Sequence, residues 1–267
     1  MPELPDAELF KRDLDAHALN QTIRGVTVGD ARILGDLPED VFVERLTGNR
    51  LLDSRRHGKH LLVRLAQHGW LTLHFGMTGA LQHVVPPETE VPYGRVRLTF
   101  DDGSLVYVNR RMLGRVGLAD DADNFIASEG LGPDALDPAL DSAALDEVLD
   151  AGRDLKTLLM DQALIAGIGN VFADEILFQA RLHPRSRGRN LNQPQRQALL
   201  ANIKEVLTKS IDLGAGAEGQ TDRMPDHFVT PHRHLGGICP RCGRALSVVK
   251  VGGRTTYACD HCQARPA

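Results

Sequence analysis

The sequence predicts an α+β protein of two domains: an N-terminal β-sandwich that begins with a helix, and a C-terminal helical domain that ends in a four-cysteine ribbon. Between residues 23 and 108, short apolar segments alternate with turns, which is typical of β-strands. From Leu155 onward, apolar residues recur at helical spacing. Two Cys-x-x-Cys motifs close the chain. We therefore expect a sandwich domain over 1–120, a linker over 121–152, a helical domain over 153–235 and the ribbon over 236–267.

Composition limits the class of protein. The 267 residues are 42% hydrophobic, which is enough for a packed core. We find neither a signal-peptide pattern nor an apolar run of about 18 residues that could span a bilayer. All four cysteines lie between 239 and 262, so none remain for disulfides elsewhere, and we expect a cytoplasmic location and no membrane partner.

Charge is unevenly distributed. The formal net charge is −4, yet residues 181–267 carry 14 Lys and Arg against 6 Asp and Glu. Because local charge sets the attraction to phosphates, this basic third is compatible with nucleic-acid binding. Much of the acidic charge lies between Asp120 and Asp154, where solvated charge on an exposed linker is the other interpretation.

The first six residues, Met-Pro-Glu-Leu-Pro-Asp, hold a candidate reactive centre. If Met1 is removed, the chain begins with the secondary amine of Pro2, followed by the carboxylate of Glu3. Residues 5–14 are predicted to form a helix, with proline and acidic residues in its first turn and apolar residues at i, i+4 and i+8. An ordinary proline-rich start to a helix explains the same residues.

The sandwich prediction depends on five short segments: 23–28, 61–65, 71–75, 95–100 and 104–108. The last two flank Asp101-Asp102-Gly103, a strong hairpin signal. We expect about six to eight strands. The glycines and prolines between 119 and 152 predict a linker with limited helix.

The C-terminal half is predicted to contain helices over 155–164, 171–180 and 193–213. The Gly-rich turn at 166–170 separates the first two, and it places backbone N–H groups and the Asn170 amide at a helix N-terminus. Such an end readily binds phosphate, although Gly-x-Gly before a helix is often only a tight turn. Residues 215–226 are polar and aperiodic and predict a mobile loop.

The cysteine spacing predicts a metal site. Cys239-x-x-Cys242, sixteen intervening residues and Cys259-x-x-Cys262 match one structural Zn²⁺ bound by four thiolates. Between the pairs, two strands are joined by Gly252-Gly253-Arg254. Arg254 is a candidate phosphate contact or an ordinary solvated residue of a turn.

Together these motifs resemble the formamidopyrimidine-DNA glycosylase and endonuclease VIII family of base-excision repair enzymes. The opening MPELPD is similar to the family's MPELPE, HFGMTG at 74–79 to its HLGMSG, LMDQALIAGIGNVFADEILF at 159–178 to its helix-two-turns-helix, and the terminal segment to its zinc finger. The resemblance implies a monomer that kinks damaged duplex DNA and flips a nucleotide out.

The resemblance also implies residue roles. Pro2 would attack C1′ of the damaged nucleotide, Glu3 would assist ring opening and proton transfer, and both flanking phosphates would be eliminated without a catalytic metal. Lys59 would lie near the scissile phosphate. The implied DNA-binding residues are His74 and Lys156 on the backbone, Asn170 and Arg254 on phosphates, and Met77, Arg111 and Leu113 in the void left by the flipped base. Glu175 matches an acid near the active site, and a structural role explains it equally well.

Some positions depart from the family pattern. Asp6 replaces a glutamate, Leu113 an intercalating phenylalanine, and His232 a phosphate-binding tyrosine. The stretch 214–228 does not resemble the base-capping loop of the members that prefer 8-oxoguanine, so the preferred lesion stays open. A non-catalytic protein that recognises damaged DNA, and a zinc-ribbon protein of RNA or the transcription machinery, are the alternative functions.

Overall fold

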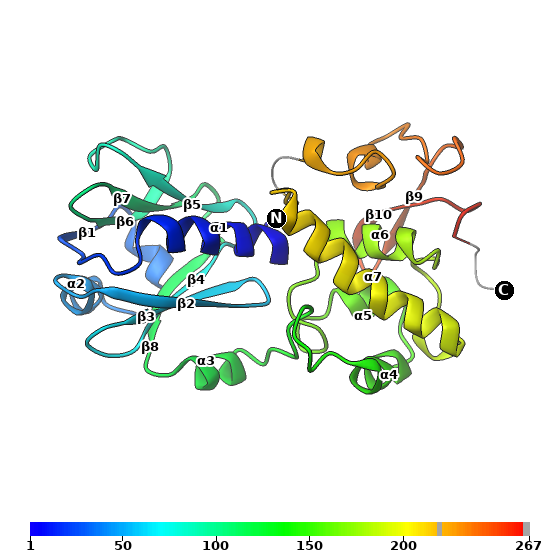
Figure 1. Ribbon diagram of the computed structural model, residues 1–267, viewed down its shortest axis with the longest axis horizontal. Coiled ribbons are helices and arrows are strands. Elements are labelled where there is room, and N and C mark those ends of the chain that lie inside the picture. Colours follow the sequence, from blue (N-terminus) through cyan, green and yellow to red (C-terminus); the bar gives the residue numbers. More distant parts are fainter. Residues whose placement is uncertain (218–220, 264–267) are drawn as a thin grey trace. The chain divides into compact units, whose positions relative to one another are not determined.

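The computed structural model describes residues 1–217 and 221–263 and divides into two compact units (Figure 1). The N-terminal unit comprises Met1–Pro2 and Asp6–Glu129. The C-terminal unit comprises Glu3–Pro5 and the chain from Gly130 onward. The start of the chain therefore contributes three residues to the C-terminal unit. The segment 121–152, expected to be a linker, is shared between the units and includes two short helices, α3 (Ala122–Ser128) and α4 (Ser142–Asp150).

A β-sandwich forms the N-terminal unit, all of whose residues the structure describes. Its two four-stranded antiparallel sheets have the orders β1-β6-β7-β5 and β2-β3-β4-β8. The expected hairpin is confirmed, because β6 and β7 pair from Thr99 and Ser104 outward. The strands are β1 (Gly25–Val28), β2 (Leu51–His57), β3 (His60–Leu65), β4 (Trp70–His74), β5 (Gly79–Val84), β6 (Gly94–Thr99), β7 (Ser104–Asn109) and β8 (Arg115–Ala119).

Two helices complete this unit. Helix α1 (Leu4–His17) buries Ala7 and Leu14 in the sandwich core together with apolar residues of both sheets. Helix α2 (Glu39–Leu46), which our sequence analysis did not predict, follows Pro38 and buries Phe42 and Leu46. Its signal was present in the sequence, since acidic residues after a proline and apolar residues four apart mark a helix start.

Helices dominate the C-terminal unit. Helices α5 (Leu155–Leu159) and α6 (Asn170–Gln179) flank a ten-residue turn region, and the long α7 (Gln193–Asp212) packs against α6. A reciprocal capping box between Asn192 and Gln195 fixes the start of α7. The helices expected over 171–180 and 193–213 are confirmed, whereas the helix expected over 155–164 already ends at Leu159. Among the described residues, no helix is long and apolar enough to cross a bilayer.

The expected ribbon is an antiparallel hairpin of β9 (Ser247–Val251) and β10 (Arg254–Ala258). Strand β10 contacts α6, and Phe178 of that helix packs with Val229, Leu246 and the buried Cys239 and Cys259. The ribbon is therefore joined to the helical core through its own small apolar cluster.

Candidate functional site

Glu3 is buried, and its carboxylate lies at the N-terminus of α6. Oε2 accepts hydrogen bonds from the backbone N–H of Gly169 at 2.8 Å and of Phe172 at 3.1 Å, and Oε1 accepts one from Val171 at 2.8 Å. A helix N-terminus presents unpaired N–H groups and a partial positive charge, so it stabilises a carboxylate. Glu3, the first acidic residue of the sequence, is thereby fixed against the Gly-rich turn.

This arrangement corrects one expectation. The N–H groups at the start of α6 were predicted to be available to a phosphate, but three of them bind Glu3 instead. The glycines of the turn have a steric role. A Cβ at Gly169 would lie 2.6 Å from Oε1 of Glu3, and one at Gly167 would lie 2.5 Å from Cδ1 of Leu4, so only glycine admits the N-terminal segment here.

Pro2 and Lys59 both belong to the N-terminal unit. Pro2 is buried, and Lys59 follows Gly58 in the tight turn that joins β2 to β3. Arg56 braces this turn, because its guanidinium donates to the Gly58 carbonyl at 3.1 Å and pairs with Glu8 of α1 at 3.0 Å. The sheet hairpin thus fixes the backbone from which the Lys59 side chain extends.

The residues expected to fill the DNA void lie in two turns, β4–β5 and β7–β8. Gly76 of the first turn packs so closely on the second that a Cβ there would overlap the Leu113 carbonyl. Arg111 lies 3.5 Å from the sulfur of Met77, and the Leu113 side chain is 51% exposed. The structure therefore brings Met77, Arg111 and Leu113 together at one edge of the sandwich.

His74, expected to contact the DNA backbone, ends β4 beside the same two turns. Its carbonyl accepts a hydrogen bond from the Tyr107 hydroxyl at 2.7 Å, and its ring stacks on His60 with centroids 4.7 Å apart. Burial, followed by the charges of Lys59 and Arg115, lowers the pKa of His74 to about 4. Any contact it makes with a phosphate at neutral pH would therefore come from an uncharged ring.

Lys156, expected on the DNA backbone, is fully buried instead. Its amine lies 2.7 Å from Oδ1 of Asp174 and 2.8 Å from the Thr256 hydroxyl, and burial lowers its pKa. Oδ2 of Asp174 also accepts hydrogen bonds from Nη2 of Arg233 at 2.9 Å and from the backbone N–H of Tyr257 at 3.1 Å. In this structure the Lys156 side chain holds α5, α6 and the ribbon together and offers no surface to a ligand.

Glu175 has a structural environment. It is buried, and burial raises its pKa. Its carboxylate accepts hydrogen bonds from the Thr230 amide and hydroxyl and from the Val229 amide, which fixes the segment that leads to the ribbon. These contacts support the structural role that we considered for this residue.

Asn170 and Arg254, expected on phosphates, lie in different elements of the C-terminal unit. Asn170 begins α6, and its buried Oδ1, which has no hydrogen-bond partner among the described residues, is an acceptor, so a phosphate contact would have to come from its Nδ2 amino group. Arg254 is exposed at the start of β10 and lines a cavity of about 260 Å³ with Arg153 and Thr157 of the α5 region. Both assignments stay predictions.

The four cysteines fit one tetrahedral metal ion. Their sulfur atoms all lie within 4.8 Å of one another, with Cys242 and Cys259 at 3.5 Å and Cys239 and Cys262 at 3.9 Å. Zn–S bonds of about 2.3 Å place tetrahedral sulfurs about 3.8 Å apart, which matches this cluster. The chain holds a structural zinc site, and its ligands belong to the ribbon rather than to the region of Glu3.

Sequence analysis missed several residues that shape these sites. Arg233 completes the buried ion-pair network around Asp174, and His60 stacks on His74. Arg233 had a weak signal, as one of the cations of the basic third. His60 had none, because a histidine in an apolar strand reads as a core residue.

Three family models match the chain in order. The formamidopyrimidine-DNA glycosylase N-terminal domain matches residues 1–116, and the H2TH domain of the same enzymes matches residues 131–222. The zinc finger found in FPG and IleRS matches residues 238–265.

Curated relatives match over nearly the whole chain. A formamidopyrimidine-DNA glycosylase of Thermomicrobium roseum is 34% identical, over 98% of this chain and 99% of the relative. One from Pelobacter propionicus is 33% identical, over 98% and 100%.

Solved structures have the same fold. Wild-type Lactococcus lactis Fpg (MutM) bound to DNA with an oxidised pyrimidine superposes with a TM-score of 0.90 at 27% identity, covering 99% of this chain and 100% of that one. MutM bound to DNA with carbocyclic 8-oxo-G has a TM-score of 0.89, the same identity and the same coverage.

Proposed function

Because the chain belongs to the formamidopyrimidine-DNA glycosylase family, we propose that it is a DNA glycosylase with abasic-site lyase activity that removes oxidised bases from duplex DNA. Its partner is damaged double-stranded DNA, on which it acts as a monomer. The nucleophile is the amine of Pro2, released when Met1 is removed.

The position of Glu3 is the observation that carries this proposal. Three backbone N–H groups and the positive end of α6 hold its carboxylate in one place, immediately next in sequence to Pro2. A carboxyl group used for proton transfer has to be fixed relative to the nucleophile. Gly167 and Gly169 leave room for Leu4 and Glu3 to pack against the turn before α6. A helix start that did not receive the N-terminal segment would not need glycine at these positions.

The chemistry balances without a metal. The Pro2 nitrogen attacks C1′, and the base leaves with the electrons of its glycosidic bond. Opening of the sugar ring, assisted by Glu3, gives an iminium between C1′ and the Pro2 nitrogen. Loss of a C2′ proton breaks the C3′–O bond, and a second elimination breaks the C5′–O bond. Water then hydrolyses the iminium and frees the enzyme.

The remaining residues bind the DNA. Phosphates are bound by the cationic side chains of Lys59 and Arg254 and by Asn170. His74 adds a contact to the DNA backbone through its uncharged ring. Met77, Arg111 and Leu113, gathered at one edge of the sandwich, enter the space left by the flipped base. Leu113 is a smaller wedge than phenylalanine and cannot stack, so we expect Arg111 and Met77 to supply more of the filling.

The preferred lesion is left to experiment. Within the stretch 214–228, which departs from the base-capping loop, residues 218–220 lie outside the described part of the chain. In the described part, Met224 and Phe228 are buried in the helical core. Relatives have been solved with an oxidised pyrimidine and with carbocyclic 8-oxo-G, so both lesion classes belong in the test.

Borohydride trapping tests the proposal. The purified protein, with loss of Met1 checked by intact mass, is incubated with duplexes that carry an abasic site, 8-oxoguanine, formamidopyrimidine or an oxidised pyrimidine. We expect a reduced covalent adduct that maps to Pro2, retained DNA binding with much less adduct in Pro2→Gly, and yields that rank the lesions. Measurable DNA binding without an adduct, despite removal of Met1, would instead favour a protein that recognises damage without cleaving it.

A further inference from the structure

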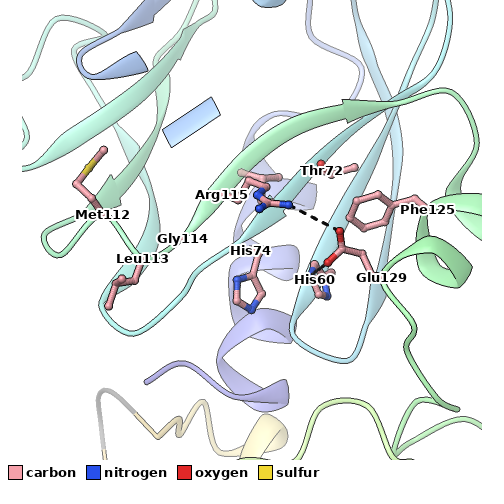
Figure 2. A pocket seen from close by; sticks show the side chains of 10 residues that line it. His60, Thr72, His74, Met112, Leu113, Gly114, Arg115, Phe125 and Glu129 are labelled. Carbon is pink, nitrogen blue, oxygen red and sulfur yellow. Dashed lines mark ion pairs between the residues drawn. The ribbon is translucent and has the colours of Figure 1, made fainter. Parts of the chain in front are cut away.

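A cavity of about 310 Å³ lies in the N-terminal unit beside the β7–β8 turn (Figure 2). Its walls come from strands β3 and β4, from the segment 112–115, and from Phe125 of α3 and Glu129 just after that helix. Of its lining residues, the proposed reaction uses only His74 and Leu113. The rest of the cavity has no role in that reaction, although its side chains are chemically varied.

One wall is aromatic. The rings of His60 and His74 stack with centroids 4.7 Å apart and planes 30° apart, and the rings of Phe125 and His60 make a T-shaped contact with centroids 5.7 Å apart. Leu73 and Met112 add apolar surface. Such surfaces bind flat heteroaromatic rings, because every base has a π-face that can stack on an aromatic side chain.

The aromatic wall is uncharged at neutral pH. The pKa of His60 is lowered to about 3, chiefly by burial and then by His74, His57, Lys59 and Arg115, and that of His74 is lowered to about 4, chiefly by burial and then by Lys59 and Arg115. Among the described residues that line the cavity, the charged side chains are Arg115 and Glu129, which have opposite signs. This lining favours a neutral polar ligand over a phosphate or a carboxylate.

Arg115 and Glu129 retain hydrogen-bonding capacity. Nη1 of Arg115 lies 3.9 Å from Oε1 of Glu129, and Nε2 of His60 lies 4.0 Å from Oε2 (dashed in Figure 2). Both distances exceed a hydrogen bond. His60 is 9% exposed, and its Nδ1 is buried without a hydrogen-bond partner among the described residues. The cavity therefore presents a carboxylate acceptor next to a guanidinium donor, over an aromatic wall.

We propose that this cavity binds an unpaired guanine base, stacked on the His60–His74–Phe125 wall and read at its edge by Glu129 and Arg115. The carboxylate accepts from N1–H and the N2 amino group, which lie side by side on guanine, and the guanidinium donates to O6 and N7. Adenine offers a carboxylate its N6 amino group alone, and cytosine offers one amino group on a smaller ring. The chemistry therefore selects guanine.

The base has two candidate sources, a free nucleoside or a guanine displaced from a duplex. Leu113 belongs both to the cavity lining and to the turn expected to enter DNA. Displacement from a duplex at this turn rests on the proposed function, whereas binding of a free nucleoside does not.

Titration of the full chain with 2′-deoxyguanosine and 2′-deoxyadenosine, followed by NMR, tests the site itself. We expect 2′-deoxyguanosine to bind about tenfold more tightly, as one well-formed bidentate contact supplies, and Glu129→Gln to abolish the preference. Asp123→Asn, which changes an exposed carboxylate of α3 paired with Arg55, is the matched control and should retain it. Equal binding of the two nucleosides, displacement of 2′-deoxyguanosine by inorganic phosphate, or an unchanged preference in Glu129→Gln would overturn the proposal.

A second titration identifies the source. Duplexes with one bulged guanine or one bulged adenine are compared in the wild type and in Glu129→Gln. A guanine preference that Glu129→Gln removes would assign the ligand to DNA, and equal binding of both duplexes would overturn that source and leave the free base. The nucleoside titration measures binding and needs no cleavage. It therefore tests the guanine site even if the protein forms no borohydride adduct, so failure of the proposed function and failure of this inference can be told apart.

Discussion

Gly169 lies so close to Glu3 that a side chain at position 169 would collide with the Glu3 carboxylate. A Cβ at 169 would stand 2.6 Å from Oε1 of the Glu3 carboxylate, inside van der Waals contact. The Gly169 amide donates to the other oxygen of the same group at 2.8 Å. The turn before α6 therefore fixes the N-terminal acid by a hydrogen bond and by exclusion of bulk.

Gly169→Ala should displace the Glu3 carboxylate and lower adduct formation at least tenfold. A displacement of a catalytic group by about 1 Å can lower the rate by about two orders of magnitude. Borohydride trapping under single-turnover conditions measures the effect. Gly25→Ala, where the added Cβ would meet only Thr99 at 3.9 Å, is the matched control. Full adduct formation in Gly169→Ala would show that the position of Glu3 is not needed.

Asp174→Asn should be the most destabilising single change in the ion-pair network of the C-terminal unit. It leaves the buried Lys156 and the mostly buried Arg233 without their shared carboxylate, and breaking such a pair costs about 3–5 kcal/mol of unfolding free energy. Lys156→Met should cost less, because Asp174 keeps Arg233. Urea unfolding measures both. Asp150→Asn, which changes an exposed carboxylate and leaves Arg196 its pair with Asp146, should change stability by about 1 kcal/mol or less. A smaller loss in Asp174→Asn than in Lys156→Met would contradict this ordering.

Local patterns in the sequence were sufficient for several parts of the fold. The Asp101-Asp102-Gly103 turn joins neighbouring strands, and each Cys-x-x-Cys pair is set by one turn, so short-range spacing predicted both the β6–β7 hairpin and the ribbon. The same holds for α7, whose Asn192 cap and apolar period lie within one segment.

Contacts between distant segments could not be predicted in this way. Spacing cannot show that Glu3 caps a helix that begins at residue 170, nor that Lys156 turns inward to Asp174 and Thr256. A lysine is normally exposed, and Lys156 is buried because two distant elements, α6 and β10, supply its partners. The resemblance to a family suggested a role for Lys156 at the DNA, and only the structure revealed its contacts inside the protein.

Arg254→Ala and Lys59→Ala should each lower the salt dependence of DNA binding. If each side chain neutralises one phosphate, the slope of log Kobs against log salt should fall in magnitude by about one. Fluorescence anisotropy with an abasic-site duplex at several salt concentrations measures the slope. Arg32→Ala, which removes an exposed cation paired with Asp30, should leave it unchanged. An unaltered slope in either variant would remove that residue from the phosphate contacts.

Acidification should destabilise the N-terminal unit through the stacked histidines. Their pKa values, about 3 for His60 and about 4 for His74, lie below the value near 6.5 of an unfolded histidine. Between these limits the unfolded chain binds more protons, so the free energy of unfolding falls as pH decreases from about 6.5 towards 4. The slope is about 1.4 kcal/mol per pH unit for each histidine. Urea unfolding between pH 4 and 7 measures this slope. His60→Phe should reduce it by the contribution of one proton, about 1.4 kcal/mol per pH unit. His68→Asn, which changes an exposed histidine of the same unit, is the control. An unchanged slope in His60→Phe would mean that His60 takes up its proton as readily in the folded protein as in the unfolded chain.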